Sequence, residues 1–320
     1  MPIANDNRVC VYLGEGLARY AFPGGHPFGA GRMEAFWDEM IRNGLDGGVT
    51  VRAPVMAAQE VIERFHTHAH VARIKAMSAR GWGDFDAGDT PAFAGVYEAA
   101  AYVVGSTVDA VKCIMERSCR RAFVPIAGLH HAARDAATGF CIFNDIGVAI
   151  EILRSGYGVQ RIAYVDIDVH HGDGVFYAYE TDPQIYIVDV HENGRYLFPG
   201  TGAAHEIGRG AAAGSKLNIP LSPGAGDTAF LQVWPRIEAF VRHARPEFII
   251  LQCGADSLAG DPLANLTYSP ATHAYAATRL CEIAEECCEG RILALGGGGY
   301  NLDNLARAWT AVVRAFIETP

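Results

Sequence analysis

The chain has little of several features that mark common classes of protein. Its eight cysteines form no CxxC pair, which excludes zinc-ribbon spacing and makes a disulfide framework unexpected in a chain of 320 residues. Basic residues are few: 26 Lys and Arg stand against 36 Asp and Glu, for a formal net charge of -10. No basic cluster occurs, so we expect neither a nucleic acid nor an anionic membrane surface as partner.

Long apolar runs are also missing. None approaches the roughly 20 residues that a membrane-spanning helix requires, although half of the residues are hydrophobic. The segment Met1–Asn7 has no basic stretch followed by an apolar core. We therefore expect no secretory signal, and a cytoplasmic protein whose thiols are reduced.

The second half of the chain alternates short β-branched runs with longer amphipathic patterns, which is typical of a parallel sheet covered by helices. Strands are predicted over 161–167, 184–190, 247–253 and 291–295. Helices are predicted over 31–43, 57–80, 97–116, 145–154, 227–243, 270–286 and 302–317, and irregular stretches over 81–95 and 191–226. No linker divides the chain, so we predict a single domain over residues 1–320. Ligands of such sheets bind at the carboxyl ends of the strands.

Acidic and imidazole groups are densest just after the strand predicted at 161–167, in the segment from Asp166 to Asp173. Alternation along an extended strand would put Asp166, Asp168 and His170 on one side. Carboxylate oxygen with imidazole nitrogen suits Zn2+ or Fe2+, and Asp256, after the strand at 247–253, offers a third ligand. Three ligands with an open fourth position form the catalytic arrangement of zinc. The alternatives are a turn that faces water and, for Asp256, a helix cap.

Two further segments carry candidate catalytic groups. The adjacent His130 and His131 follow an apolar stretch, and we interpret them as a general base and acid pair. Tyr300 follows four glycines, whose loop would carry the phenol into a site as an electrophile. Taken singly each pattern is weak, because histidines are common in cores and glycine runs are typical of flexible turns.

Together and in this order, the segments resemble the histone deacetylase superfamily, including its acetoin-utilisation and acetylpolyamine amidohydrolase branches. The resemblance covers nearly the whole chain, through His26-Pro27 with Arg32, and through Gly128–Ala132, Gly139–Asp145, Asp166–Gly174, Phe198–Gly202, Gly254–Pro262 and Leu295–Asn301. It implies the arginase/deacetylase fold, a single α/β domain with an eight-stranded parallel sheet flanked by helices on both faces.

The resemblance also implies roles for individual residues. The zinc ligands of the family fall on Asp168, His170 and Asp256. Its catalytic groups fall on His130 and His131, on their carboxylate partners Asp166 and Asp173, and on Tyr300. Its substrate-binding positions fall on a rim aspartate, Asp89, on the tunnel walls Gly139, Phe140 and Phe198, and on Leu263 at the tunnel mouth. A K+ or Na+ ion would lie near Asp166, where Asp189 replaces a serine that is common in the family.

The implied activity is zinc-dependent hydrolysis of an N-acetyl or other acyl amide, on an acetyl-lysine-like side chain or a small acetylated amine, with release of acetate. Polyamine-selective relatives carry a glutamate where this chain has Leu263, so we expect a neutral acetyl-lysine-like substrate to be preferred. Asp84, Asp86 and Asp89, in the irregular stretch at 81–95, are the acidic residues of which any would take the part of the glutamate if the acetylpolyamine alternative holds. The substrate is a peptide or a small molecule, and a homo-oligomer stays open.

Other readings remain. A binuclear manganese ureohydrolase shares the fold, but Gly172 stands where a carboxylate would bridge a second metal. A dinucleotide site after the strand-like segment at 9–13 has Gly14 and Gly16, but Arg19 replaces the third glycine of the fingerprint. The chain could also be a non-catalytic scaffold that keeps the fold. Such a protein would not need the metal ligands, the two histidines or Tyr300, and their presence argues against this alternative.

Overall fold

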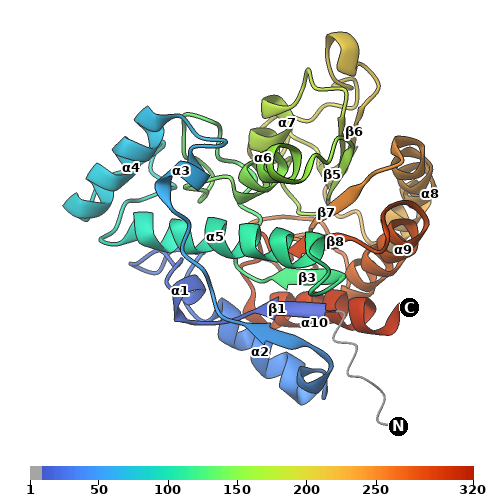
Figure 1. Cartoon of the computed structure of the whole chain (residues 1–320), viewed down its shortest axis with the longest axis horizontal. Helices are drawn as coiled ribbons and strands as arrows, with labels where there is room; N and C mark the ends of the chain where they lie inside the picture. Colours follow the sequence, from blue (N-terminus) through green and yellow to red (C-terminus); the bar gives the residue numbers. More distant parts are fainter. Residues whose placement is uncertain (1–8) are drawn as a thin grey trace.

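The computed structural model describes residues 9–320 (Figure 1). Residues 1–8 lie outside the described part, and so does the expectation that Met1–Asn7 is not a secretory signal. Eight strands form one sheet in the order β2-β1-β3-β8-β7-β4-β5-β6, and every neighbouring pair is parallel. This confirms the predicted fold class.

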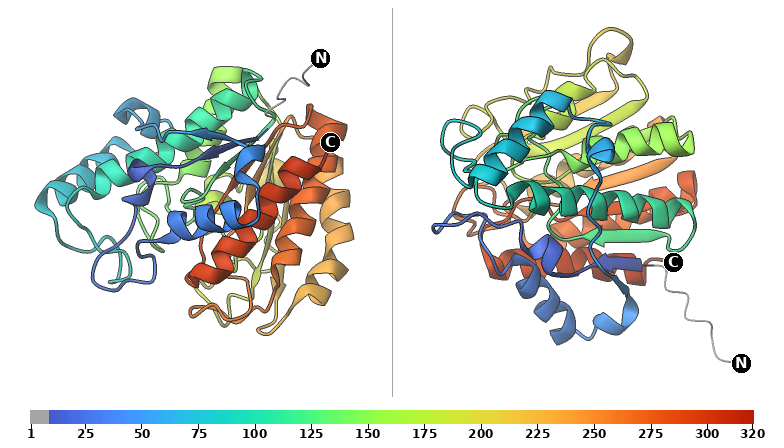
Figure 2. Two further views of the ribbon diagram at one scale, coloured as in Figure 1. Left: turned by 90° about the horizontal axis from the view of Figure 1, so that it is seen from below. Right: turned by 60° about the vertical axis from the view of Figure 1, so that its left-hand side comes forward.

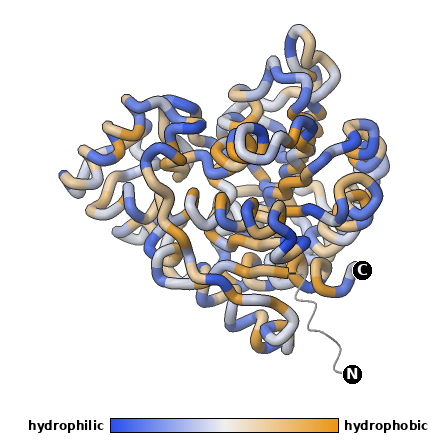
Figure 3. Tube along the Cα trace, in the orientation of Figure 1, coloured by the Kyte–Doolittle hydropathy of each residue, from blue (hydrophilic) through white to orange (hydrophobic). Residues whose placement is uncertain are grey.

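The strands are short and most are buried on both faces. Their bounds are β1 Val9–Tyr12, β2 Thr50–Arg52, β3 Arg121–Val124, β4 Ile162–Asp166, β5 Ile185–Glu192, β6 Lys216–Leu221, β7 Phe248–Gln252 and β8 Ile292–Leu295. Every residue of β1, β3, β4, β7 and β8 is buried. Strands covered by helices on both sides read as continuous apolar runs, and the central strands are largely hydrophobic in Figure 3.

Between residues 9 and 320, ten α-helices surround the sheet (Figures 1 and 2). They are α1 Glu15–Ala18, α2 Arg32–Arg42, α3 Gln59–Ile62, α4 His68–Arg80, α5 Val96–Met115, α6 Asp145–Tyr157, α7 Asp173–Ala178, α8 Asp227–Ala244, α9 Pro270–Cys288 and α10 Leu302–Glu318. One buried cluster joins the sheet to α4, α5, α6 and α7, and a second joins its other face to α2, α8, α9 and α10. The helices therefore lie on both faces, as predicted.

The structure corrects two predicted segments. The helix predicted over 57–80 is two helices, because Thr67 accepts a hydrogen bond from the backbone N–H of His70 and so caps the start of α4. The stretch predicted as irregular over 191–226 contains the end of β5 and all of β6. Strand β6 pairs only with β5, at the edge of the sheet, where Pro220 is tolerated, and this proline made the segment resemble a loop.

No described helix is both long and apolar enough to cross a membrane. The cytoplasmic location and the oligomeric state stay predictions.

Candidate active site

Four neighbouring strands bring the candidate residues to one edge of the sheet. In the order β3-β8-β7-β4, the segment with His130 and His131 follows β3, Tyr300 follows β8, Asp256 follows β7 and Asp168 follows β4. Because the strands are parallel, their carboxyl ends meet at the same edge. Groups that are more than 100 residues apart in sequence become neighbours there.

Asp168, His170 and Asp256 form a buried cluster whose ligand atoms all lie within 4.8 Å of one another. The Nδ1 atom of His170 lies 3.1 Å from Asp168 Oδ1 and 3.2 Å from Asp256 Oδ2. Apart from this contact with the His170 ring, the buried Oδ2 atom of Asp256 has no hydrogen-bond partner among residues 9–320. A buried carboxylate oxygen with so little of its acceptor capacity used is costly, so the donor set fits a metal cation.

The electrostatics of the cluster also favour a cation. Burial and the neighbouring Asp168 carboxylate raise the pKa of Asp256 to about 7. Burial alone would lower the pKa of His170, but its close contacts with the Asp168 and Asp256 carboxylates raise it to about 10. The negative charge of Asp168 contributes to both shifts, because a carboxylate at close range favours a proton on either neighbour.

The turn after β4 forms the cluster by a route that differs from the sequence argument. Strand β4 ends at Asp166, so Asp168 and His170 lie beyond the strand, and the predicted strand alternation over these residues was wrong. Instead, the N–H of Asp168 donates to Asp166 Oδ1 at 3.0 Å, and the N–H of His170 donates to Asp168 Oδ1 at 2.9 Å. Two successive side-chain-to-backbone turns bring Asp168 and His170 to Asp256.

The tandem histidines each face a carboxylate. His130 Nδ1 lies 2.8 Å from Asp166 Oδ2, and His131 Nδ1 lies 2.7 Å from Asp173 Oδ1. Their Nε2 atoms are 3.1 Å apart and face each other. Burial and the neighbouring His130 lower the pKa of His131 to about 4. His131 is therefore neutral at pH 7, the form that can accept a proton.

The loop that carries these histidines is held by the start of α6. The buried Asp145 carboxylate accepts hydrogen bonds from the N–H groups of Gly128, at 3.1 Å, and Leu129, at 2.8 Å. Asn144, the cap of α6, donates to the carbonyl of Ala132 at 2.9 Å. These hydrogen bonds fix the backbone of the loop in a conformation in which both adjacent histidines face the same site.

A hollow of about 340 Å³ leads to the cluster from the surface. We call it the tunnel; it is lined by His26, Pro27, Gly88, Asp89, His131, Gly139, Phe140, His170, Leu197, Phe198, Leu263 and Tyr300. All five substrate-binding positions implied by the resemblance are in this set. A smaller inner space beside Asp168 and Asp256 shares His131, Gly139, His170 and Tyr300 with it.

Aromatic rings form a large part of the tunnel wall. The ring of Phe198 lies 5.0 Å from the ring of His131, and the ring of Phe140 meets that of Tyr300 edge to face at 5.7 Å. Gly139 has φ of +57°, and a Cβ atom there would fall 2.6 Å from His131 Cδ2. Only glycine leaves the passage open at this point.

The three acidic residues of the loop at 81–95 have different surroundings in the structure. Oδ1 of Asp86 accepts the N–H groups of Gly88, Asp89 and Thr90 at 2.8–3.2 Å, so this carboxylate is used to build the loop. Asp84 does not line the tunnel. Asp89 does line it, and its exposed carboxylate forms no hydrogen bond with the described residues. Asp89 is therefore the acidic group of this loop that is free to meet a substrate.

The loop before Tyr300 is anchored from several sides. Arg32, buried under the loop, donates to the carbonyls of Gly297 at 2.7 Å and Gly299 at 3.2 Å. The N–H of Gly298 donates to Asp168 Oδ2 at 3.0 Å. Burial raises the pKa of Tyr300 well above its usual range, so its phenol keeps a proton to donate.

Asp189 lies beside Asp166 on the neighbouring strand β5. Its Oδ1 is 2.7 Å from His191 Nδ1, and its Oδ2 accepts the N–H of Gly172 at 2.8 Å. His191 Nε2 is 3.0 Å from the carbonyl of Gly202. The charge that Asp189 adds is therefore paired within the protein, and a monovalent cation near Asp166 and Asp189 stays a prediction.

Sequence reasoning missed three residues that hold the site. Gln252 donates to Asp168 Oδ2 at 2.9 Å, the Tyr164 hydroxyl donates to Asp166 Oδ2, and Asp261 binds the backbone of Tyr300. Gln252 carried a readable signal, because an amide at the end of the apolar run Phe248–Leu251 is unusual unless it has a buried partner. Asp261 carried none, since its partner lies 39 residues away.

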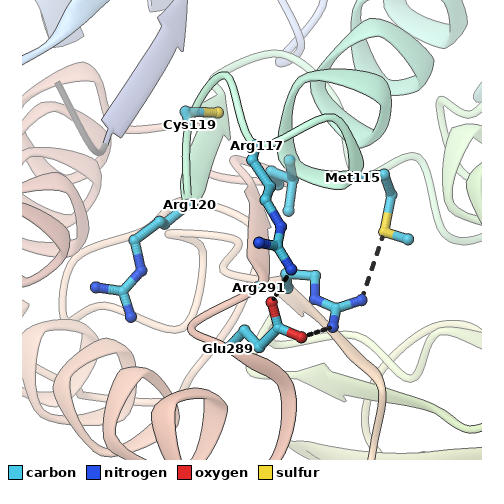
Figure 4. A pocket seen from close by; sticks show the side chains of 7 residues that line it. Met115, Arg117, Cys119, Arg120, Glu289 and Arg291 are labelled. Atoms are coloured by element: carbon cyan, nitrogen blue, oxygen red, sulfur yellow. Dashed lines mark hydrogen bonds and ion pairs between the residues drawn. The ribbon is translucent and has the colours of Figure 1, made fainter. Parts of the chain in front are cut away.

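Another hollow, of about 290 Å³, lies far from these residues, where α5 ends and β3 and β8 begin (Figure 4). Glu289 is flanked there by Arg117, at 2.8 Å, and by Arg291, at 3.1 Å. These charges satisfy one another. The hollow at the amino ends of the strands is therefore not the candidate active site.

The fold and the grouped side chains together define a hydrolase of the deacetylase fold. The sequence matches the family described as "Histone deacetylase domain" over residues 26–316, and the chain belongs to this family. The resemblance inferred from the motifs is confirmed.

Named relatives cover nearly the whole chain. It is 35% identical over 303 residues to the acetoin utilization protein AcuC of Bacillus subtilis, which covers 92% of this chain and 78% of that protein. It is 33% identical over 320 residues to the histone deacetylase HDAC1 of Drosophila melanogaster, covering 97% of this chain and 60% of that protein. The crystal structure of the HDA15 HD domain superposes with a TM-score of 0.88 at 26% identity, over 98% of this chain and 88% of that one.

Proposed function

We propose that the chain is a zinc-dependent amide hydrolase that removes the acetyl group from an acetyl-lysine-like side chain and releases acetate. The observation that carries this proposal is the buried cluster of Asp168, His170 and Asp256, with an Asp256 Oδ2 atom that has no hydrogen bond beyond its contact with His170, at the inner end of the tunnel. A cation at that point and an extended aliphatic stem in the tunnel would satisfy both features.

Asp168, His170 and Asp256 would hold the metal. Two carboxylates with one imidazole are a donor set that zinc accepts, and Fe2+ is the alternative. Zinc held there supplies a Lewis acid that activates water at neutral pH and polarises the acyl carbonyl. Gln252 keeps Asp168 oriented through its 2.9 Å hydrogen bond.

The other side chains would manage the protons and the developing charge. Neutral His131, oriented by Asp173, takes a proton from the attacking water. His130, paired with the fully buried Asp166, supports the site electrostatically. The phenol of Tyr300 donates a hydrogen bond to the carbonyl oxygen as it becomes negative, an interaction that is strongest in the tetrahedral transition state.

The tunnel lining favours a neutral, lysine-like stem. Phe140 and Phe198 offer apolar contact along the walls, and Leu263 offers no charge at the mouth. Asp89 would accept hydrogen bonds from the backbone N–H groups of a peptide. The same free carboxylate would attract the second ammonium of an acetylated polyamine, so an acetylpolyamine amidohydrolase is the second candidate function.

Acetate release by the protein loaded with Zn2+ tests the proposal, with acetyl-lysine peptides as substrate and bound metal measured by atomic emission. We expect one metal ion per chain and loss of activity on chelation. Asp256→Asn should lose both metal and activity, whereas Asp38→Asn, a charge change on an exposed position of α2, should keep both. Two metal ions per chain, or full activity without metal, would contradict the proposal.

Substrate choice is tested separately by comparing kcat/KM for an acetyl-lysine peptide and for acetylputrescine. We expect the peptide to be preferred, because one charge contact contributes roughly 1–3 kcal/mol, about ten- to a hundredfold in specificity, and Leu263 provides none. Asp89→Asn should lower kcat/KM for either substrate. A preference for acetylputrescine that disappears in Asp89→Asn would identify the polyamine enzyme instead.

A further inference from the structure

The position of Tyr300 depends on contacts from outside its own loop. Four glycines, residues 296–299, precede it, and Gly297 and Gly299 have φ of +66° and +119°. Glycine has the widest choice of backbone conformations, so the loop alone does not hold its last residue in place. A hydrogen-bond donor in an active site must nevertheless be held to within about 0.5 Å.

Asp261 supplies a contact at this point. Its Oδ2 accepts the N–H of Tyr300 at 2.8 Å, and its Oδ1 accepts the N–H of Leu263 at 2.9 Å. One carboxylate thus joins the loop after β8, which carries the phenol, to the loop after β7, which carries the tunnel mouth. Arg32 holds carbonyls earlier in the glycine loop and does not reach the Tyr300 amide.

The surroundings of Asp261 are unusual for a carboxylate. Only 7% of the residue is exposed, and it forms no ion pair with any residue from 9 to 320. Its carboxylate oxygens instead face two backbone N–H groups. Burying a charged group without a cation is unfavourable. Such a group is expected where two segments must be held at a defined separation.

We propose that Asp261 is the positioning residue for Tyr300, holding the phenol where it meets the substrate carbonyl. This inference rests on the proposed function, which gives Tyr300 its part in the reaction. Asp261 itself touches neither the substrate nor the metal cluster through the hydrogen bonds described. Its effect on turnover therefore passes through Tyr300.

Asp261→Asn is the direct test, because an amide has one acceptor oxygen and one NH2 group in place of two oxygens. At least one of the two backbone N–H groups, that of Tyr300 or that of Leu263, then faces the NH2 group of asparagine and loses its acceptor. We expect kcat to fall at least about tenfold, KM to stay within about twofold, and metal content to stay unchanged. Asp261→Glu keeps both acceptor oxygens and should retain more of kcat than Asp261→Asn.

A double-mutant cycle with Tyr300→Phe separates positioning from a general structural role. If Asp261 acts through the phenol, Asp261→Asn should cost less than about twofold further in the Tyr300→Phe background. Equal fold losses in both backgrounds overturn the proposal, as does a loss confined to KM, which would place the effect at Leu263. If Asp261→Asn does not fold, the same cycle is run with Asp261→Glu.

The matched control is Asp227→Asn. Asp227 also anchors backbone and hydroxyl groups, those of Ser269 and Thr272, at 2.6–2.7 Å, but outside the tunnel. This variant should keep kcat. Amide hydrogen exchange over residues 296–301 gives a readout without turnover: it should be faster in Asp261→Asn than in Asp227→Asn, and unchanged exchange overturns the proposal even if the protein releases no acetate. Absence of acetate release by the unaltered protein contradicts the proposed function alone.

Discussion

Gly298→Ala should disable the metal cluster while leaving the fold intact. The N–H of Gly298 donates to Asp168 Oδ2 at 3.0 Å, so the backbone passes directly over the ligands. A Cβ atom added there would fall 2.0 Å from Asp256 Oδ2 and 2.9 Å from Asp168 Oδ2. Gly298 is not among the glycines with positive φ, so alanine suits its backbone and the clash with the carboxylates is the main perturbation.

The magnitude follows from these distances. Cβ atoms essentially never approach another heavy atom closer than 3.0 Å, so the Asp256 carboxylate or the loop must move by about 1 Å, whereas metal–ligand distances tolerate only about 0.2 Å. Disturbing a group that merely supports a ligand costs about 10–100-fold in metal affinity. Moving a ligand should cost at least about 100-fold, or about 2.8 kcal/mol.

The assay is competition for Zn2+ against a chelator of known affinity, with circular dichroism to verify the fold. Gly156→Ala is the control, because a Cβ atom at this position of α6 would meet nothing within 4 Å. It should bind metal as the unaltered protein does. Zinc affinity within about threefold of normal in Gly298→Ala would refute the assignment of Asp256 as a ligand.

Two further predictions address the transition state and acid stability. Tyr300→Phe should lower kcat about 10²–10³-fold with little change in KM; an effect on KM alone would show that its role is misassigned. Hydrogen bonds from Arg279, and then from Arg242 and Trp234, lower the pKa of Glu238 to about 2, against 4.5 ordinarily. The ionised Glu238 carboxylate therefore stabilises the folded state fully above pH 4.5, and this stabilisation is lost as the pH falls toward 2. Glu238→Gln should reduce the free energy of unfolding by about 2 kcal/mol at pH 7 and much less at pH 2, and equal urea midpoint shifts at both pH values would argue against this.

The sequence patterns predicted four of the eight described strands. Strands β4, β5, β7 and β8 stood out because strands buried on both faces are continuous apolar runs. Strand β6 did not, since an edge strand tolerates the polar residues and the proline that it contains. Strand β1 was noted only as the strand-like segment at 9–13 and β3 only as the apolar stretch before His130, and β2 has three residues, none of them buried, so that no apolar run marks it.

By itself, the sequence determined the fold class, the family and the polar residues at the carboxyl ends of the strands, because side-chain chemistry and apolar periodicity are local properties. Only the tertiary structure decided which polar groups meet. It brought Asp256 to His170, paired His130 with Asp166, and placed Asp261 against the backbone N–H of Tyr300. The physical reason is that parallel strands are joined by long crossovers, so the partner of a buried carboxylate lies far away in sequence and no local pattern identifies it.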